Sequence, residues 1–307
     1  MYDNVKFWID RAIVGDQIYT IANYLDNAKD TADHNTGELN ITFGTIENLE
    51  VYIRESGVCI KGSLAKFLNG NNIIPFDLSH TIEAIEKIEE RLHIKMGEAR
   101  VTSLEFGKTF VMGHDPKEYL IRLGEMPRRE RWLYPNKGSL YYKHLADNQP
   151  NEYKFYDKKA EAIKKKVTIP DEFADTFLLR VEMAYYSRLR TQLSWAEVSA
   201  RTLIEIGFYR HLIELFQNQY FSINKVYRND MSKGTTNKEK AMIMLGTLTE
   251  QHPDDARTIV EGFTFKSRTD KARFNKYVSK ARELYTPPTN DDLVKELDDK
   301  IKSCSDI

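Results

Sequence analysis

Cysteine is scarce in this chain: of its 307 residues only Cys59 and Cys304 are cysteines. Two cysteines so far apart provide neither a disulfide framework nor a zinc site, and this scarcity is typical of a reducing compartment. No apolar run approaches the roughly 20 residues of a membrane-spanning helix. The first residues carry Asp3 and Asp10 where a signal peptide is apolar. We therefore expect a cytoplasmic protein with no membrane partner.

Net charge is also nearly absent. The chain has 45 lysine and arginine residues against 46 aspartate and glutamate residues, which leaves a net charge of −1. Bulk charge therefore argues neither for nor against a nucleic-acid partner, and any basic surface must be local.

Several sequence motifs are missing as well. The chain contains no Walker-type glycine loop, no G-x-S-x-G elbow, no zinc spacing and no internal repeat. No two histidines form a His-hydrophobic-His pair, and a lone histidine is usually structural. The seven histidines are His34, His80, His93, His114, His144, His211 and His252. His144 ranks above the others because it lies on the predicted hairpin described next.

The patterns that are present divide the chain near residue 190. Residues 101–112 and 176–186 alternate apolar and polar side chains, as half-buried strands do. GSLYYKH and NEYKFYD flank a polar segment and predict a β-hairpin with a longer loop. After residue 190 helical spacing dominates, and Ser194 with Glu197 predicts a helix start. We predict an α+β protein with a sheet-based domain over 1–190 and a helical DNA-binding or accessory domain over 191–307.

Three predicted strands each carry one reactive side chain. Glu105 and Glu182 are the single acids of their strands, and Tyr156 ends the second strand of the hairpin. Together they predict one site on the face of a sheet. Two alternatives remain open: either glutamate lies on a solvated face, or Glu182 pairs with Arg180, which shares its face.

Tyr156 is a candidate nucleophile for attack on a phosphodiester. A free tyrosine has a pKa of about 10 and needs help to react at neutral pH. Nearby lysines favour the phenolate and stabilise a negatively charged phosphorane. Lys158 shares the face of Tyr156 if the strand continues, and Lys159 does if a helix begins there. Both lysines are therefore candidates for the residue that assists Tyr156.

A divalent cation fits the same group of side chains. Glu105, with Glu182 as a partner, supplies the carboxylate oxygens that Mg²⁺ or Mn²⁺ prefers. Zinc is not expected without cysteines or clustered histidines.

Two local basic segments are candidate DNA-binding surfaces. The first contains Arg128, Arg129 and Arg131, just before the hairpin, together with Trp132. The second lies on the predicted helix 266–285, where Phe274, Val278, Ala281 and Tyr285 point inward. Its outward cations are Arg273, Lys276 and Lys280. The alternative for this helix is an ordinary solvated face.

Four stretches occur in the order seen in rolling-circle replication initiators. They are GVCIKGSLAKFLNGNN (57–72), VTSLEFGKTF (101–110), YKFYDKKAE (153–161) and LLRVEMAYY (178–186). Over roughly residues 50–190 the chain resembles the filamentous-phage nickase type of replication protein and related plasmid initiators. The resemblance implies an antiparallel HUH-type fold in which Tyr156 is the nucleophile and Glu105 takes the place of a metal-binding aspartate. That family more often has arginine and aspartate where this chain has Ser103 and Glu105.

The resemblance also implies a function. Such proteins nick one strand at the replication origin, keep its 5′ phosphate on the tyrosine and later reseal the strand. Single-stranded DNA and origin duplex are then the expected partners, with a host helicase as a further one, in the cytoplasm of a bacterial host. Two alternatives are a non-catalytic DNA-binding replication regulator and a metal-dependent nuclease that uses water.

Overall fold

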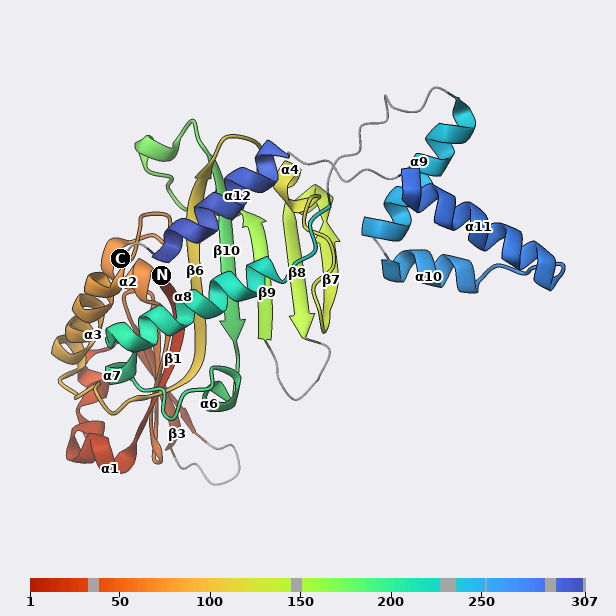
Figure 1. Ribbon diagram of the computed structural model, residues 1–307. Coiled ribbons are helices and arrows are strands. Elements are labelled where there is room, and N and C mark those ends of the chain that lie inside the picture. Colours follow the sequence, from red (N-terminus) through yellow and green to blue (C-terminus); the bar gives the residue numbers. More distant parts are fainter. Residues whose placement is uncertain (33–38, 145–150, 227–235, 252, 285–290, 306–307) are drawn as a thin grey trace.

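The computed structural model describes residues 1–32, 39–144, 151–226, 236–251, 253–284 and 291–305. It has an α+β architecture built on a ten-stranded sheet whose strand pairings are all antiparallel (Figure 1). Within these residues, no helix combines the length and the apolar character needed to cross a bilayer.

The sheet has the order β2-β3-β4-β5-β1-β6-β10-β9-β8-β7. Its first five strands in the chain are β1 (Tyr2–Asp10), β2 (Asp26–Ala32), β3 (Leu39–Ile46), β4 (Leu49–Arg54) and β5 (Gly57–Ser63). The other five are β6 (Arg100–Met112), β7 (Arg129–Tyr134), β8 (Ser139–His144), β9 (Asn151–Asp157) and β10 (Phe177–Tyr185).

The strand order contains a repeat that is not visible in the sequence. In each half the first strand is central, the second forms an outer edge, and the next three return strand by strand to pair with the first. The central strands β1 and β6 are antiparallel neighbours, with Val5 opposite Leu104. The two halves of the sheet are therefore related by an approximate two-fold axis perpendicular to the sheet at this pair.

Helices cover one face of the sheet. They include α3 (Leu78–Leu92), α8 (Ile206–Phe221) and α12 (Asp292–Lys302), and α8 and α12 cross in front of the strands in Figure 1. Phe216 of α8 packs edge-on against Phe106 of β6 and Tyr153 of β9. Alternate strand residues join this core, whereas their polar neighbours point to the opposite face.

Shorter helices connect these elements. They are α1 (Arg11–Val14), α2 (Leu64–Asn69), α4 (Pro116–Leu120), α5 (Lys158–Lys164), α6 (Leu189–Gln192) and α7 (Ala200–Leu203). The strands expected at 101–112 and 176–186 and the hairpin are confirmed. The helix start expected at Ser194 is wrong: Ser194 has a φ of 50°. The N-cap that begins α7 is Ser199, whose side chain accepts a hydrogen bond from the Thr202 amide.

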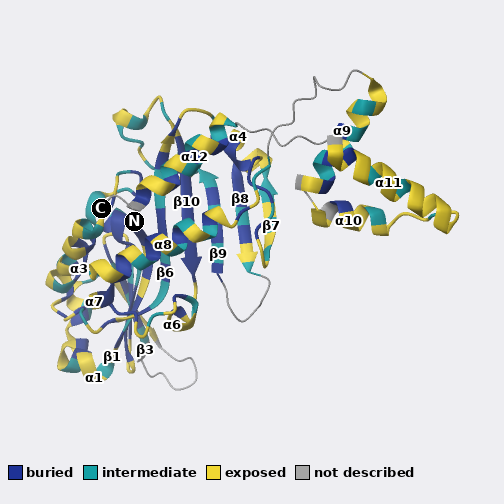
Figure 2. Cartoon of the chain, viewed as in Figure 1, coloured by how far each residue is buried: buried dark blue, intermediate teal, exposed yellow. Residues whose placement is uncertain are grey.

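Helices beyond residue 190 lie in two places. Helices α6–α8 and α12 lie beside the sheet, and α8 shares its core. Helices α9 (Asn237–Gln251), α10 (Pro253–Glu261) and α11 (Arg268–Leu284) pack on one another, with α9 in contact with both others. Figure 2 shows these three mostly exposed. The domain boundary at residue 190 stays a prediction.

Candidate active site

A cleft of about 790 Å³ lies on the face of the sheet opposite α8. Tyr156, Glu105 and Glu182 all line it, so the structure brings together the three side chains that the strand pattern placed on one face. The register explains this: Tyr156 pairs with Arg180, and Lys154 pairs with Glu182, which in turn pairs with Gly107. Glu105 is two residues from Gly107 and therefore points to the same face.

Gly107 of β6 leaves space for the buried side chain of Glu182, its partner on β10. A Cβ atom on Gly107 would lie 2.6 Å from Cγ of Glu182 and 2.4 Å from the Val181 carbonyl oxygen. The missing side chain is therefore replaced by the side chain of Glu182, which lies across β6 toward the cleft. Any larger residue at position 107 would displace Glu182.

The floor of the cleft is a buried chain of polar groups. The Tyr156 hydroxyl donates to Glu182 Oε1 at 3.0 Å, and Arg180 Nε donates to the same oxygen at 2.9 Å. The other end of the Arg180 guanidinium donates to Asp3 Oδ2 at 3.0 Å. Asp3 also accepts hydrogen bonds from Ser63 and Asn72. The expected alternative of a Glu182–Arg180 ion pair is thus present, and Tyr156 is joined to it.

The pKa values of the polar groups on the cleft floor follow from burial and from opposed charges. Burial raises the pKa of Tyr156 well above its usual value, and the charge of Glu182 raises it further. Burial also raises the pKa of Glu182, although Arg180 opposes the shift. For Asp3, burial is outweighed by Arg180 and the two hydrogen-bond donors, so its pKa is lowered. Tyr156 therefore stays protonated as a hydrogen-bond donor, and burial increases the proton affinity of the Glu182 carboxyl group that faces it.

Glu105 is held by a second ion pair. Lys154 Nζ lies 2.9 Å from Glu105 Oε1, and the Asn4 amide donates to Oε2. Burial lowers the pKa of Lys154, but Glu105 and then Glu182 outweigh it and raise that pKa overall. Lys154 is therefore the cation between the two glutamates. Glu105 is not on a solvated face, because its side chain is only 14% exposed.

The two lysines after Tyr156 lie in different places. Helix α5 begins at Lys158, whose buried Nζ is 2.8 Å from Glu161 Oε2 and 5.8 Å from the centroid of the Tyr156 ring. Burial lowers the pKa of Lys158, and Glu161 opposes this. Lys159 instead donates to the carbonyl of Ala174. Lys158 therefore contacts the tyrosine ring, and Lys159 is bonded elsewhere.

In the basic segment before the hairpin, two of the three arginines donate hydrogen bonds within the protein. Arg129 donates to the Tyr142 carbonyl and to Gln219 of α8, and burial lowers its pKa. Arg131 donates to the Leu123 carbonyl at 2.9 Å. Arg128 is exposed, and Trp132 is 41% exposed with Lys143 over its ring at 5.5 Å. Arg128 is thus the arginine of this segment with its side chain at the surface.

The second basic segment is placed as the helical spacing predicts. On α11, Arg273, Lys276 and Lys280 are exposed, whereas Ala281 is buried and Phe274 half-buried. Tyr285 lies outside the described residues. These cations belong to the separate group α9–α11 and do not line the cleft.

Sequence reasoning missed Asp3, Asn4 and Lys154. Asp3 and Asn4 lie on β1, whose alternation of Val5, Phe7 and Ile9 with polar residues is itself a strand signal. Lys154 lies two residues before Tyr156 and so shares its face. Both signals are present in the sequence, but only pairing across β6 and β10 shows which side chains meet.

One comparison with known proteins identifies a family. A family model that describes the N-terminal part of the gene II type of replication-associated protein matches residues 1–206. The search of curated proteins finds no match. The matched region includes all ten strands and the whole cleft floor, and it ends where α8 begins. Because the match spans two thirds of the chain, the protein belongs to the family of phage replication-associated proteins of the filamentous-phage gene II type.

Proposed function

We propose that the protein is a rolling-circle replication initiator of HUH-like fold that nicks and rejoins single-stranded origin DNA through a covalent 5′-phosphotyrosine. The observation that supports this most directly is the hydrogen bond from the Tyr156 hydroxyl to Glu182 in a solvent-accessible cleft. A nucleophile beside a base that a third group holds in place is the arrangement that covalent catalysis requires. Arg180 is that third group.

The proposed nicking step begins with attack of the Tyr156 oxygen on the scissile phosphorus. Its proton passes to Glu182, which lies 3.0 Å away and whose pKa is raised by burial. The bond from phosphorus to the 3′ oxygen breaks, and that oxygen leaves with a proton from solvent. The 5′ phosphate remains on Tyr156. In the reverse step the 3′ hydroxyl gives its proton to solvent and attacks the phosphotyrosine, the bond from phosphorus to the tyrosine oxygen breaks, and Glu182 returns the proton to that oxygen.

Cations around the cleft suit the phosphate charge in this step. Lys66, Lys137 and Lys164 line the cleft, and no ion pair involves them within the described residues. Lys154 lies on the floor between the two glutamates. Positive groups fixed near the phosphate favour the phosphorane and hold the strand in line.

We include Mg²⁺ or Mn²⁺ at Glu105 and Glu182 in the proposal, although the donor set fits a cation only in part. Both carboxylates line the cleft and supply hard oxygen ligands. Each already faces a cation, Lys154 or Arg180, and within the described residues no three acidic, histidine or cysteine side chains group into a metal site. Binding would require Glu105 to leave Lys154.

Glu105→Gln tests this cation site. The substitution keeps the shape and the bond to Asn4 but weakens a carboxylate ligand, so we expect nicking to fall on the order of 10- to 100-fold and to need more Mg²⁺ for half-maximal rate. The matched control is Glu152→Gln, another cleft carboxylate. Nicking that is unchanged in Glu105→Gln, or that persists in excess chelator, would rule the cation site out.

A second candidate is a non-catalytic DNA-binding regulator of the same fold. One observation favours it: burial raises the pKa of Tyr156, and its hydroxyl is bonded inside the protein. A tyrosine whose hydroxyl stays protonated is a poor nucleophile, whereas a DNA-binding surface needs no reactive tyrosine.

Covalent capture separates the candidates. The protein is incubated with 5′- and 3′-labelled single-stranded origin DNA and Mg²⁺ or Mn²⁺, and the products are resolved on a denaturing gel. A nickase yields a protein band carrying the label 3′ to the cut, a water-dependent nuclease yields free fragments only, and a regulator leaves the strand intact.

We propose that α11 binds duplex DNA beside the nick, with a host helicase as a further partner that unwinds the strand. Replacing Arg273, Lys276 and Lys280 with alanine should weaken binding to any duplex and reduce the salt slope by about 2 to 3. Nicking at saturating DNA should survive. A control that replaces Lys238, Lys240 and Arg257 removes equal charge from α9 and α10. Equal duplex affinity and equal salt slope in the two variants would show that α11 is an ordinary solvated surface.

A further inference from the structure

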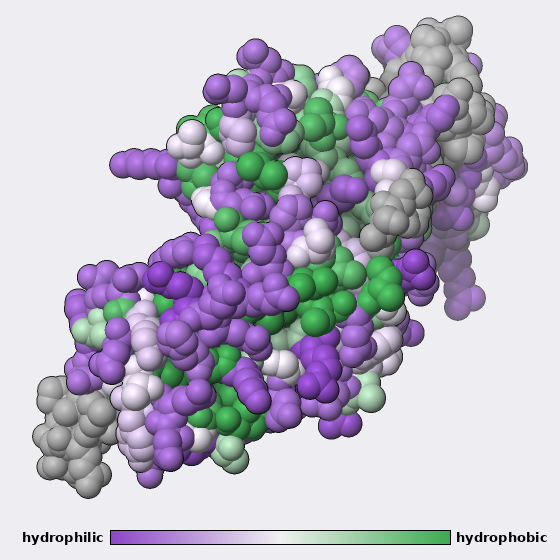
Figure 3. Space-filling model, turned by 90° about the vertical axis from the view of Figure 1, so that its left-hand side faces the viewer, coloured by the Kyte–Doolittle hydropathy of each residue, from purple (hydrophilic) through white to green (hydrophobic). Residues whose placement is uncertain are grey.

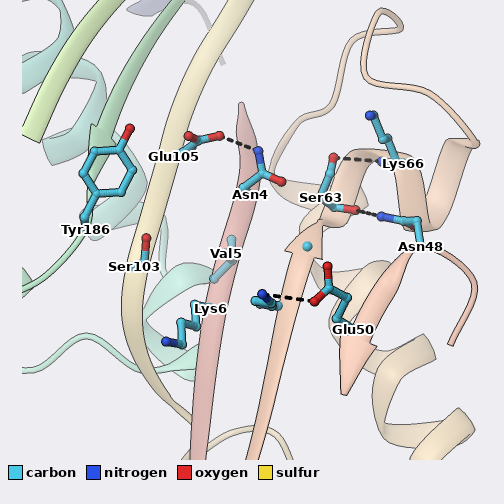
Figure 4. A pocket seen from close by; sticks show the side chains of 12 residues that line it. Asn4, Val5, Lys6, Asn48, Glu50, Ser63, Lys66, Ser103, Glu105 and Tyr186 are labelled. Atoms are coloured by element: carbon cyan, nitrogen blue, oxygen red, sulfur yellow. Dashed lines mark hydrogen bonds and ion pairs between the residues drawn. The ribbon is translucent and has the colours of Figure 1, made fainter. Parts of the chain in front are cut away.

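A second hollow, of about 420 Å³, continues from the cleft onto the first half of the sheet. The two share Asn4, Ser63, Lys66 and Glu105 as lining residues, so they form one continuous depression. In Figure 4, Asn4 of β1 and Glu105 of β6 point toward one another at this junction. We call the part over β6, β1, β5 and β4 the distal groove.

The two-fold relation between the halves shows what the distal groove lacks. An axis at the Val5–Leu104 pair superposes Lys6 on Glu105. Following the paired residues outward, it superposes Cys59 on Glu182 and Tyr52 on Lys154. The first half therefore has a cation, a thiol and an aromatic ring where the second half has its two glutamates and their lysine. It therefore does not carry the proposed chemistry.

The side chains of the distal groove suit a nucleic-acid strand. Lys61 pairs with Glu50 at 3.0 Å and also lies 5.1 Å from the ring of Tyr52. Lys6 and Lys66 form no ion pair within the described part of the chain and so leave the groove positive. Tyr186, which lines the groove, is 41% exposed. Rings that can stack on bases, together with cations for phosphates, are typical of single-strand binding surfaces.

The lining of the distal groove argues against an apolar partner there. The side of the molecule viewed in Figure 3 is mostly hydrophilic, with apolar patches separated by polar side chains. Polar groups line the distal groove itself, among them Asn48, Glu50 and Ser103. A polar, positive, shallow depression favours a phosphate-bearing chain.

We propose that the distal groove holds the part of the single DNA strand that leaves the cleft, so that the strand crosses the sheet from β9 toward β4. The identity of the occupant rests on the proposed function. Adjacent strands are about 4.8 Å apart, so the five spacings between β9 and β4 give a path of roughly 24 Å. The path accommodates several nucleotides beyond the scissile phosphate.

The test measures affinity against strand length. Fluorescein-labelled oligo(dT) of 4 to 20 nucleotides is titrated by anisotropy with the full chain carrying Tyr156→Phe, which excludes covalent capture. We expect affinity to rise with length until the groove is filled. Adding Lys6→Ala and Lys61→Ala should weaken binding of the long oligonucleotides on the order of tenfold and reduce their salt slope by about 1.4. Binding of the shortest oligonucleotides should not change.

The matched control replaces Lys95 and Lys295, two exposed lysines outside both hollows, with alanine. Loss of affinity confined to long oligonucleotides in the Lys6/Lys61 variant alone supports the proposal. Equal losses at all lengths, equal losses in the control, or no loss at all would overturn it. A length-dependent loss combined with no covalent adduct from the unsubstituted chain would reject the nickase function and leave the groove as a binding site.

Discussion

The Tyr156→Phe variant is expected to form no covalent protein–DNA adduct while folding and binding DNA nearly as the parent chain does. The substitution removes one oxygen atom and one hydrogen bond to Glu182, which costs about 1 kcal/mol of stability. Arg180 still holds Glu182. Because no nucleophilic oxygen remains, single-turnover nicking should fall to background.

Tyr141→Phe is the control, since Tyr141 is the other hairpin tyrosine that lines the cleft. Tyr142 and Tyr153 are fully buried, and their hydroxyls donate to the carbonyls of Gly124 and Phe216 on the core side. They therefore cannot reach DNA in this fold. An adduct that survives Tyr156→Phe and disappears in Tyr141→Phe would transfer the nucleophile to Tyr141.

The second large effect concerns stability. Arg180 is buried between Asp3 and Glu182, at 3.0 Å and 2.9 Å. Arg180→Gln leaves two buried carboxylates without their cation, so we expect a loss of about 3–5 kcal/mol in the free energy of unfolding. That is a large share of the 5–15 kcal/mol typical of a domain. Urea unfolding measures it, with the exposed Lys143→Gln as control; a loss below about 1 kcal/mol would contradict the account.

The same variant has a pH signature. In the parent chain the pKa of Asp3 is lower in the folded state than in the unfolded state. Its contribution to the free energy of unfolding is therefore fully present above the unfolded pKa and is lost as pH falls through the folded pKa. Without Arg180, burial raises the folded pKa values of Asp3 and Glu182 above the unfolded values. Folding then takes up protons, so the variant loses stability as pH rises. Its deficit should be larger at pH 8 than at pH 5, and a deficit independent of pH would contradict this cause.

The sequence predicts the strands of the site well because their alternation is strong. In β10 every second residue is apolar, and in β6 only Lys108 interrupts the apolar face, so the polar face that carries Glu105 and Glu182 follows from the period alone. The β8–β9 hairpin is equally clear. These patterns place Tyr156 and both glutamates on one face without any knowledge of strand order.

The partners of these side chains are harder to predict, because pairing between distant strands decides them. Asp3 meets Arg180 only because β1 lies beside β6 and β6 beside β10. Lys154, rather than Lys158, pairs with Glu105, because the register across β10 brings it there. Lys158 turns toward Glu161 where α5 begins.

The repeated strand order of the two halves of the sheet cannot be recognised in the sequence, for a physical reason. Strand pairing requires alternation and turns, and many residue types satisfy it. The superposed pairs Lys6 with Glu105 and Cys59 with Glu182 share no chemistry, so the two halves keep a topology but no recognisable sequence similarity.

Peptide mapping of the covalent adduct shows directly whether Tyr156 carries the DNA. The protein is reacted with origin single strand, trimmed with nuclease, digested with trypsin and sequenced by tandem mass spectrometry. We expect a nucleotide 5′-phosphate on Tyr156, in the peptide that begins after Lys154. A nucleotide on Tyr141 or Tyr186, or cleaved strands with free 5′ phosphates and no modified peptide, would contradict it.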